Sequence, residues 1–499
     1  MKSTLKLLAP ALALAAAGCA PVEREPVNIL WLFGEDISPW MPAYGDSTVE
    51  TPNIDYLIEN GVLFTNCYAP CSVSSPTRSA LVTGMMQTSI GMHNHRTART
   101  DKLIYSLPEG VRALPEFFRE RGYHTFNAGK DDFNWHYNWD DYWTGPHKQT
   151  AFYDKNGEGS WRDRAQGQPF FGEIELFGGK NYNPVKDGAT AADVTVPPYY
   201  PDTEATRKQM AIHYNQIKLT DQEIGKVIEQ MKEDGIWEST IIVFLSDNGY
   251  QMLRDKQFLY DSGIHMPLVI SAPGNPKLLS DLGIEMGTRD DLVSLIDLNA
   301  TTLFMAGIDI PDYMEAKNVF AKDFRRDYIV AARDRCDFTI DRIRAIRTKE
   351  FKYIRNFMTD RPLMQPQYRD GTPWSDAMKK TWREGKVKFA DDWLKDYRPS
   401  EELYDIVNDP HEINNLAADP KYSKQLAQMR GYLEEWITET DDKGQYPEPE
   451  KELEIVYQRW GDRCVNPEYD KVKRYMKVEV SDVEQYKLDR KAEQKAKTK

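Results

Sequence analysis

The sequence has 499 residues, of which 40% are hydrophobic and 28% charged, and its formal net charge is −14. This balance predicts a folded protein with a large core and excludes a chain that is disordered throughout. The acidic composition argues against a nucleic-acid-binding protein, because that mode of binding needs a net basic face. Five cysteines in so long a chain exclude a disulfide-dense scaffold.

The first 18 residues have the features of a bacterial lipoprotein signal peptide. Lys2 and Lys6 precede a short apolar stretch, which ends in small residues directly before Cys19. The stretch is too short to span a bilayer, and the order of these features is typical of a secretory signal. We therefore expect residues 1–18 to be removed, Cys19 to carry a lipid anchor and residues 19–26 to form a tether.

An anchor at Cys19 would place the protein outside the cytoplasm, in the periplasm or at the outer membrane or cell surface. We found no other segment long enough to be a transmembrane helix. Disulfides are permitted in that compartment, and Cys67 and Cys71 are close enough along the chain to pair. The sequence leaves this pairing open.

Strand and helix patterns alternate through the first two thirds of the chain. Residues 27–33 and 240–245 are continuous apolar runs, which predict strands buried on both faces. Further strands are expected at residues 169–176, 266–271 and 328–332, and helices at residues 51–58, 113–121, 217–231 and 291–305. The alternation predicts an α/β fold with a large, mostly parallel sheet flanked by helices.

The pattern changes near residue 336. Residues 342–347 and 351–355 are expected to pair as antiparallel strands, and residues 423–438 to form an amphipathic helix. We therefore divide the chain into a large domain at residues 27–335 and a smaller C-terminal α+β subdomain at residues 336–486. Residues 487–499 form a charged tail.

Two oxygen-rich turns follow the two most apolar strands. Glu35 and Asp36 come after the first strand, and Asp247 and Asn248 come after residues 240–245. Ligands bind in the crevice at the carboxyl ends of parallel strands, so we expect these four side chains to converge. Three carboxylates and an amide, without cysteine or histidine, favour calcium or magnesium over zinc.

Residues 71–84 predict a loop that turns into a helix, with Pro76 in its first turn and Gly84 at its end. Ser74 is expected just ahead of this helix, where unpaired backbone N–H groups favour an anion. Arg78 lies one turn later on the same face. Taken alone, the segment is also typical of a simple helix cap. Beside the two acidic turns, we interpret it as an oxyanion-binding site with Ser74 as nucleophile.

The segment Ser74-Ser75-Pro76-Thr77-Arg78, followed by Leu81-Val82-Thr83-Gly84, resembles the signature of the type I sulfatases, in the alkaline phosphatase superfamily. The resemblance covers nearly the whole chain and continues in the motifs at residues 51–55, 122–130, 246–249, 259–264 and 402–416. It implies that residues 27–335 are the catalytic sulfatase domain. It also implies that a sulfatase-maturating enzyme converts residue 74 to formylglycine, whose hydrated form attacks the sulfur.

The same resemblance implies roles for individual residues. The calcium ligands would be Glu35, Asp36, Asp247, Asn248 and the formylglycine made from Ser74. The sulfate would be bound and polarised by Arg78, Lys130 and Lys256. Most family members have cysteine where this chain has Ser74. The serine indicates either a serine-type enzyme, which resembles those matured by a radical maturase, or a replacement of the usual cysteine.

Three positions depart from the family pattern. Glu35 stands where aspartate is usual, Asp132 stands where many relatives have histidine, and Gly178-Gly179-Lys180 replaces another usual histidine. The group that protonates the leaving oxygen is therefore open, and the candidates are Asp132, Lys180, His136 and His265.

Further residues are expected to contact the substrate. His93 and His95 follow the nucleophile helix and are expected at the rim of the site, with Lys180 and His265 as further contacts. Asp334, Arg335 and Arg342 lie near the start of the second subdomain, and we expect them to reach the cleft and select a sugar.

The resemblance is to the bacterial heparan N-sulfatase-like branch and implies a carbohydrate sulfatase acting on a sulfated polysaccharide or its oligosaccharides. Two alternatives stay open, an N-sulfoglucosamine sulfohydrolase (sulfamidase) and a non-catalytic lipoprotein that binds sulfated glycans. Binding alone would not need the nucleophile, the arginine, both lysines and all metal ligands together, which argues against the latter. A phosphatase or phosphodiesterase is disfavoured because its metal sites usually need histidines, and the chain has 8.

Overall fold

The computed structural model describes residues 25–96, 103–146, 159–387 and 393–476. The expected signal peptide, Cys19, most of the tether and the charged tail lie outside these ranges. Across the described ranges, none of the helices combines the length and the apolar character that crossing a membrane requires.

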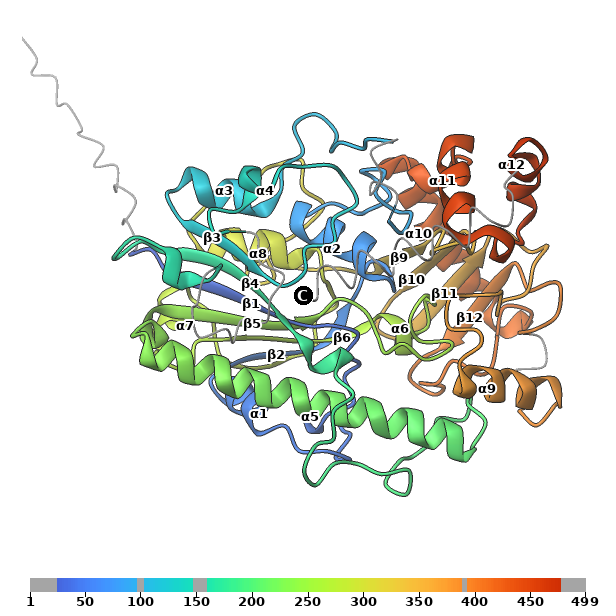
Figure 1. The fold of residues 1–499 in the computed structure, drawn as a ribbon, viewed down its shortest axis with the longest axis horizontal. Helices are drawn as coiled ribbons and strands as arrows, with labels where there is room; N and C mark the ends of the chain where they lie inside the picture. Colours follow the sequence, from blue (N-terminus) through green and yellow to red (C-terminus); the bar gives the residue numbers. More distant parts are fainter. Residues whose placement is uncertain (1–24, 97–102, 147–158, 388–392, 477–499) are drawn as a thin grey trace, which may run out of the picture.

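A large sheet forms the centre of the first domain (Figure 1). Its eight strands are β1 (Asn28–Gly34), β2 (Gly61–Tyr68), β3 (His124–Ala128), β4 (Phe170–Leu176), β5 (Thr240–Ser246), β6 (His265–Ser271), β7 (Gly287–Arg289) and β8 (Val293–Ser294). The order is β3-β4-β1-β5-β6-β2-β7, and β8 pairs with β2. Only the β6 pairings, with β5 and β2, are antiparallel in this sheet of the described chain, which confirms a mostly parallel sheet.

Helices cover both faces of this sheet (Figure 1). The helices α1 (Pro52–Glu59) and α5 (Glu204–Glu233) contact each other on one face, and α2 (Ser74–Thr83), α3 (Leu114–Glu120) and α8 (Asp297–Met305) pack together on the other. Short helices complete the domain: α4 (Trp139–Tyr142), α6 (Asp261–Ile264) and α7 (Lys277–Asp281). Because helices lie on both faces, every residue of β1 and β5 is buried, as the two apolar runs predicted.

A separate antiparallel sheet forms the core of the second subdomain. Its strands are β9 (Ile329–Arg333), β10 (Ile343–Arg347), β11 (Phe351–Asn356) and β12 (Glu401–Asp405), in the order β12-β11-β10-β9. Its helices are α9 (Pro373–Arg383), α10 (Ser423–Thr440), α11 (Glu450–Trp460) and α12 (Asp470–Tyr475). The expected antiparallel pair is β10 with β11, and the expected amphipathic helix is α10, which packs on both strands.

Several elements differ from those expected. The strand expected at residues 328–332 forms as β9, but it pairs with β10 in the second sheet, so the boundary placed after residue 335 falls inside that sheet. A run of apolar residues predicts a strand that is buried on both faces, but it does not predict the sheet to which the strand belongs. Strand β2 was missed because a bulge between Phe64 and Cys67 places polar residues in its middle. The helix expected from residue 291 starts later, as α8, after the short strand β8.

The described cysteines are all free thiols and are buried. Cys67 lies within β2, whereas Cys71 packs with Val73 and Cys336 in a small cluster between the loop before α2 and the second subdomain. The Cys67–Cys71 pairing that the sequence left open is therefore not formed.

Candidate active site

The two acidic turns meet because β1 and β5 are parallel neighbours, with Gly34 opposite Ser246 in the register. The Asp36 backbone N–H donates to Asp247 Oδ1 at 3.4 Å, and Asn248 Nδ2 donates to Asp36 Oδ1 at 2.7 Å. Glu35, Asp36, Asp247 and Asn248 are all buried. The convergence expected at the carboxyl ends of these strands is present.

Ser74 lies at the first residue of α2, a helix in which every residue is buried. Its Oγ donates to Asn248 Oδ1 at 3.1 Å. The residue expected to be the nucleophile is therefore in direct contact with one of the residues expected to hold the metal.

Arg78, one turn into α2, is held by three groups. Its Nε donates to Asp247 Oδ2 at 3.0 Å, its Nη1 to the Lys130 carbonyl at 2.9 Å, and its Nη2 to Glu175 Oε2 at 2.6 Å. Burial lowers the pKa of the Arg78 guanidinium, but the carboxylates of Glu175 and Asp247 outweigh this and raise it above its usual range. Arg78 therefore keeps its charge in the interior.

Glu175, at the end of β4, was not identified from the sequence. The available signal was a pair of glutamates, Glu173 and Glu175, inside a strand whose every residue is buried. Burial raises the pKa of Glu175 to about 7, and Arg78 and Lys130 oppose this shift.

Three lysines surround the acidic turns. Lys130 Nζ lies 2.5 Å from Glu35 Oε1 and 3.3 Å from Asp132 Oδ2, and Lys256 Nζ lies 2.5 Å from Asp36 Oδ1. Lys180 also contacts Glu35. The side chains predicted to bind sulfate, together with Lys180, therefore place positive charge around Ser74.

A close backbone approach explains the glycine at position 179. Gly179 lies in the 3₁₀ turn η3 (Phe177–Lys180), and a Cβ at this position would lie 1.7 Å from the Glu35 carbonyl oxygen. Only glycine allows this approach, which brings Lys180 to Glu35.

The chemistry of the acidic turns fits a hard divalent cation. Three carboxylates and an amide converge, and Asp36 Oδ2 is buried without a hydrogen-bond partner. In the described part of the chain, no group of three histidine, cysteine or acidic side chains is arranged to hold a metal ion, since Glu35 faces Lys130 and Lys180 while Asp36 faces Lys256. The donor set therefore has the composition of a site for a hard divalent cation, with Glu35 and Asp36 paired to lysines and Asp247 paired to Arg78.

Several of these groups line a cavity of about 270 Å³ that both parts of the molecule form. From the first domain come Ser74, Asp36, Asp132, Lys130, Lys180 and Lys256, and from the second Asp337, Tyr368, Arg459 and Trp460. Nothing in the sequence spacing of these four residues of the second subdomain pointed to the site. The aromatic and basic residues of the second subdomain add a surface suited to an anionic sugar.

Strained backbone is concentrated at this cavity. Nine non-glycine residues of the described chain have positive φ, and five of them line the cavity: Asp36, Arg96, Asp132, Gln257 and Asp337. Such conformations persist where the surrounding structure holds them, and they occur preferentially at functional sites.

The remaining predicted residues divide into two groups. His95 lines the cavity, with its Nδ1 3.2 Å from Asp337 Oδ1. The others are not among the described residues that line it, namely His93, His136, His265, Asp334, Arg335 and Arg342. His265 contacts the Thr65 carbonyl at the start of β6, 2.8 Å away. Asp334 pairs with Arg344 at 3.0 Å and Arg335 with Glu448 at 2.7 Å, because the turn after β9 directs both into the second subdomain.

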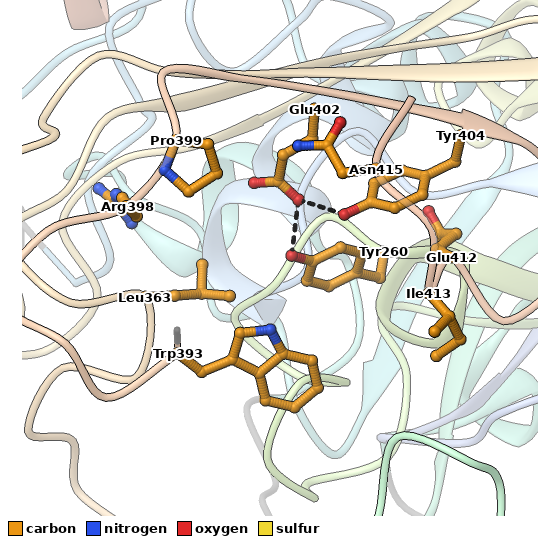
Figure 2. Close-up of a pocket in the computed structure, with 10 residues that line it drawn as sticks. All are labelled: Tyr260, Leu363, Trp393, Arg398, Pro399, Glu402, Tyr404, Glu412, Ile413 and Asn415. Carbon is orange, nitrogen blue, oxygen red and sulfur yellow. Dashed lines mark hydrogen bonds between the residues drawn. The ribbon is translucent and has the colours of Figure 1, made fainter. Parts of the chain in front are cut away.

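A second cavity, of about 230 Å³, has a different character. Figure 2 shows its aromatic walls and the Glu402 carboxylate, which accepts hydrogen bonds from Tyr260 at 2.9 Å and from Tyr404 at 2.7 Å. Arg398, another lining residue, is paired with Asp341. These polar groups are held by protein partners and join the two parts of the chain.

Comparisons with known proteins agree with the geometry. The sulfatase family model matches residues 27–308. An ulvan-active sulfatase of Formosa agariphila is 33% identical over 89% of this chain and 79% of its own length, and human N-sulphoglucosamine sulphohydrolase is 26% identical over 84% and 91%. A solved 2-O GAG sulfatase superposes with a TM-score of 0.60 at 20% identity, over 86% of this chain and 96% of its own. The chain therefore belongs to the sulfatase family, within the alkaline phosphatase superfamily, and is a sulfuric ester hydrolase.

Proposed function

We propose that the protein is a carbohydrate sulfatase that removes sulfate from a sulfated polysaccharide or its oligosaccharides. The observation that carries the proposal is the cavity lined by Ser74, Lys130 and Lys256 together with Trp460 and Tyr368, with Arg78 bound to the Lys130 carbonyl. Hydrolysis of a sulfate ester develops negative charge on the sulfate and leaving oxygens, so a buried site with fixed cations lowers the barrier. The names of the similar sulfatases support a carbohydrate substrate.

Two groups complete this chemistry. Calcium, held by Glu35, Asp36, Asp247 and Asn248, would add a Lewis acid beside the sulfate, and formylglycine made from Ser74 by a sulfatase-maturating enzyme would supply a hydrated aldehyde as nucleophile. The side chains of the protein bind and orient the sulfate. Arg78 is fixed by Asp247 and Glu175, and the lysines are poised around the position of the sulfate.

The second subdomain is proposed to recognise the sugar. Trp460, at the end of α11, packs against Phe338 with 5.2 Å between ring centroids, so its ring is held in place at the cavity. We infer that Trp460 and Tyr368 contact the sugar ring and that Arg459 interacts with a second anionic group. Trp460→Ala should raise KM for an oligosaccharide while leaving KM for a small aryl sulfate nearly unchanged.

The first experiment measures the mass of the tryptic peptide that contains Ser74, in protein made with and without a sulfatase maturase. Sulfate release is measured in parallel from a panel of O-sulfated and N-sulfated glycans. Loss of about two hydrogens at residue 74 together with release from O-sulfated glycans is the expected result. Release from N-sulfated glucosamine alone would identify a sulfamidase.

An unmodified serine without release, but with retained glycan binding, would indicate a binding protein or a chain in which the usual cysteine has been replaced. Ser74→Cys separates these two outcomes, because only an enzyme with a replaced cysteine would gain sulfate release. Ser74→Ala is the matched inactive control.

We also propose that the protein is an exported lipoprotein, on the features of residues 1–19. Cys19→Ser should abolish incorporation of labelled palmitate in bacterial cells and release the mature protein from the membrane fraction. Labelling that persists in Cys19→Ser would contradict the proposed anchor.

A further inference from the structure

His95 and Asp337 face each other in the wall of the active-site cavity. The His95 Nδ1 atom lies 3.2 Å from Asp337 Oδ1, and each side chain is 11% exposed. Both residues line the cavity that contains Ser74. Because Asp337 faces Nδ1, the other ring nitrogen, Nε2, remains for a proton transfer to another group.

A buried arginine holds both members of this pair by their backbones. Arg335 Nη1 donates to the His95 carbonyl at 3.2 Å and to the Asp337 carbonyl at 2.8 Å, while the His95 N–H donates to the Arg335 carbonyl at 2.9 Å. Arg335 is itself fixed by Glu448, whose carboxylate accepts from Nε at 2.7 Å. Arg335, predicted to select a sugar, is therefore placed to position the pair.

The segment that carries His95 is held from the other side as well. Asn134 Nδ2 donates to the Met92 and Asn94 carbonyls, and Asn134 Oδ1 accepts from the Arg96 N–H at 3.1 Å. Asp337 has a φ of +52°, a strained backbone conformation for a residue other than glycine. The pair is thus preorganised by groups far from the sulfate.

Four other ionisable residues that line the cavity lie at or beside the acidic turns. Lys130 and Lys180 contact Glu35, Lys256 contacts Asp36, and Asp132 lies 3.3 Å from Lys130. Of the described residues that line the cavity, His95 is the only histidine, and its carboxylate partner is Asp337 rather than a residue of the acidic turns.

We propose that His95 protonates the leaving oxygen of the sugar and that Asp337 is its positioning residue. This assignment rests on the proposed function as a carbohydrate sulfatase. As the bond between sulfur and the sugar oxygen breaks, its electron pair stays on that oxygen, which takes the proton from His95 Nε2. The sulfur forms its new bond to the hydroxyl oxygen at residue 74, whose proton passes to solvent, and the neutral imidazole takes up a proton from solvent.

Burial sets the pH behaviour of His95. Burial, together with Arg96, lowers the pKa of His95 below its usual value, and the carboxylates of Asp337 and Asp132 oppose this shift without reversing it. Burial alone would raise the pKa of Asp337, but His95, Arg96 and Arg459 outweigh this and lower it to about 2, so Asp337 is a carboxylate at neutral pH. This carboxylate favours the protonated imidazole that a proton donor needs.

The test compares leaving groups with mature wild-type protein, His95→Gln and the exposed control His411→Gln. Sulfate release is measured from 4-nitrophenyl sulfate, whose leaving oxygen needs no proton, from phenyl sulfate, and from the best glycan of the panel. We expect His95→Gln to lose about 10²- to 10⁴-fold in kcat on the glycan and on phenyl sulfate, with little loss on 4-nitrophenyl sulfate. His411→Gln should match wild type on all three.

Asp337→Asn, Lys180→Gln and the mature wild-type protein distinguish the other possible outcomes of the test. In Asp337→Asn, the fall of kcat/KM with rising pH on the glycan should move to lower pH, because the carboxylate that favours protonated His95 is gone. An equal loss on all substrates in His95→Gln, or a leaving-group-dependent loss in Lys180→Gln instead, would overturn the assignment. If mature wild-type protein releases sulfate from aryl sulfates but from no glycan, the proposed carbohydrate substrate fails, and the comparison of the aryl sulfates still decides the role of His95.

Discussion

The guanidinium of Arg78 lies 2.6 Å from the carboxylate of Glu175, and their side chains are only 2% and 1% exposed. The contact joins the first turn of α2, which begins at Ser74, to the carboxyl end of β4, two strands away from β5 and its acidic turn. With Asp247 on its other edge, the guanidinium plane has a fixed orientation. The proposed sulfate site is therefore assembled from three strand ends and one helix.

Removing Glu175 tests this arrangement. Glu175→Ala leaves the buried Arg78 without one of its partners, so we expect the free energy of unfolding to fall by about 3–5 kcal/mol, and less in Glu175→Gln, which keeps an acceptor oxygen. Both should lower kcat/KM because Arg78 loses its fixed orientation. Urea denaturation and sulfate release measure the two effects. Glu204→Ala removes an exposed ion pair with Lys208 and should change neither; stability of Glu175→Ala equal to wild type would contradict the role of the pair.

Substitution of Gly179 tests its close approach to the Glu35 carbonyl oxygen. A methyl group in Gly179→Ala would collide with the Glu35 carbonyl oxygen, which must then move together with η3 and Lys180. We expect lower stability, weaker calcium binding and loss of sulfate release. Gly431→Ala is the matched control, because Gly431 lies inside α10 with no atom within 4 Å of the new methyl group. It should stabilise the protein by up to about 1 kcal/mol. Equal calcium affinity in the two variants would contradict this account.

The sequence was most informative where local pattern and function coincide. Two apolar runs predicted β1 and β5, and the acidic residues directly after them predicted the meeting of Asp36 with Asp247, because parallel neighbouring strands end at the same edge. The motif that begins at Ser74 was also predicted from local sequence, because the start of the helix and Arg78 lie within one turn of each other.

Contacts between segments that are distant in the sequence could not be predicted from local patterns. Glu175, Asp337 and Trp460 reach the site through the arrangement of β4, the turn after β9 and the end of α11, and no spacing in the sequence encodes these directions. The same limit explains why Asp334 and Arg335, placed at the substrate by their position in the chain, turn toward Arg344 and Glu448 instead.

Asp247 tests the metal proposal. Asp247→Asn removes one negative charge from the acidic turns and from the contact with Arg78. We expect calcium affinity, measured by isothermal titration calorimetry on the unmatured protein, to fall at least about tenfold, and sulfate release by the matured protein to fall about a hundredfold or more. Asp309→Asn changes an exposed carboxylate and is the control. Unchanged calcium binding in Asp247→Asn would place the metal elsewhere.

Glu173 gives the stability a specific pH dependence. It lies in the middle of β4, where burial raises its pKa to about 8, while Arg78 and the amide of Asn127, 2.8 Å away, oppose the shift. The ordinary value is 4.5, so across this interval the folded protein holds a proton that the unfolded chain has lost. Stability from this group is present at low pH and declines as the pH rises toward 8, by about 1 kcal/mol per pH unit.

Glu173→Gln mimics the protonated acid and removes this contribution. Urea denaturation of the two proteins between about pH 5 and pH 8 should give curves that diverge in favour of the variant as the pH increases. Other buried acids contribute equally to both proteins, so parallel curves would show that Glu173 is ionised in the folded state.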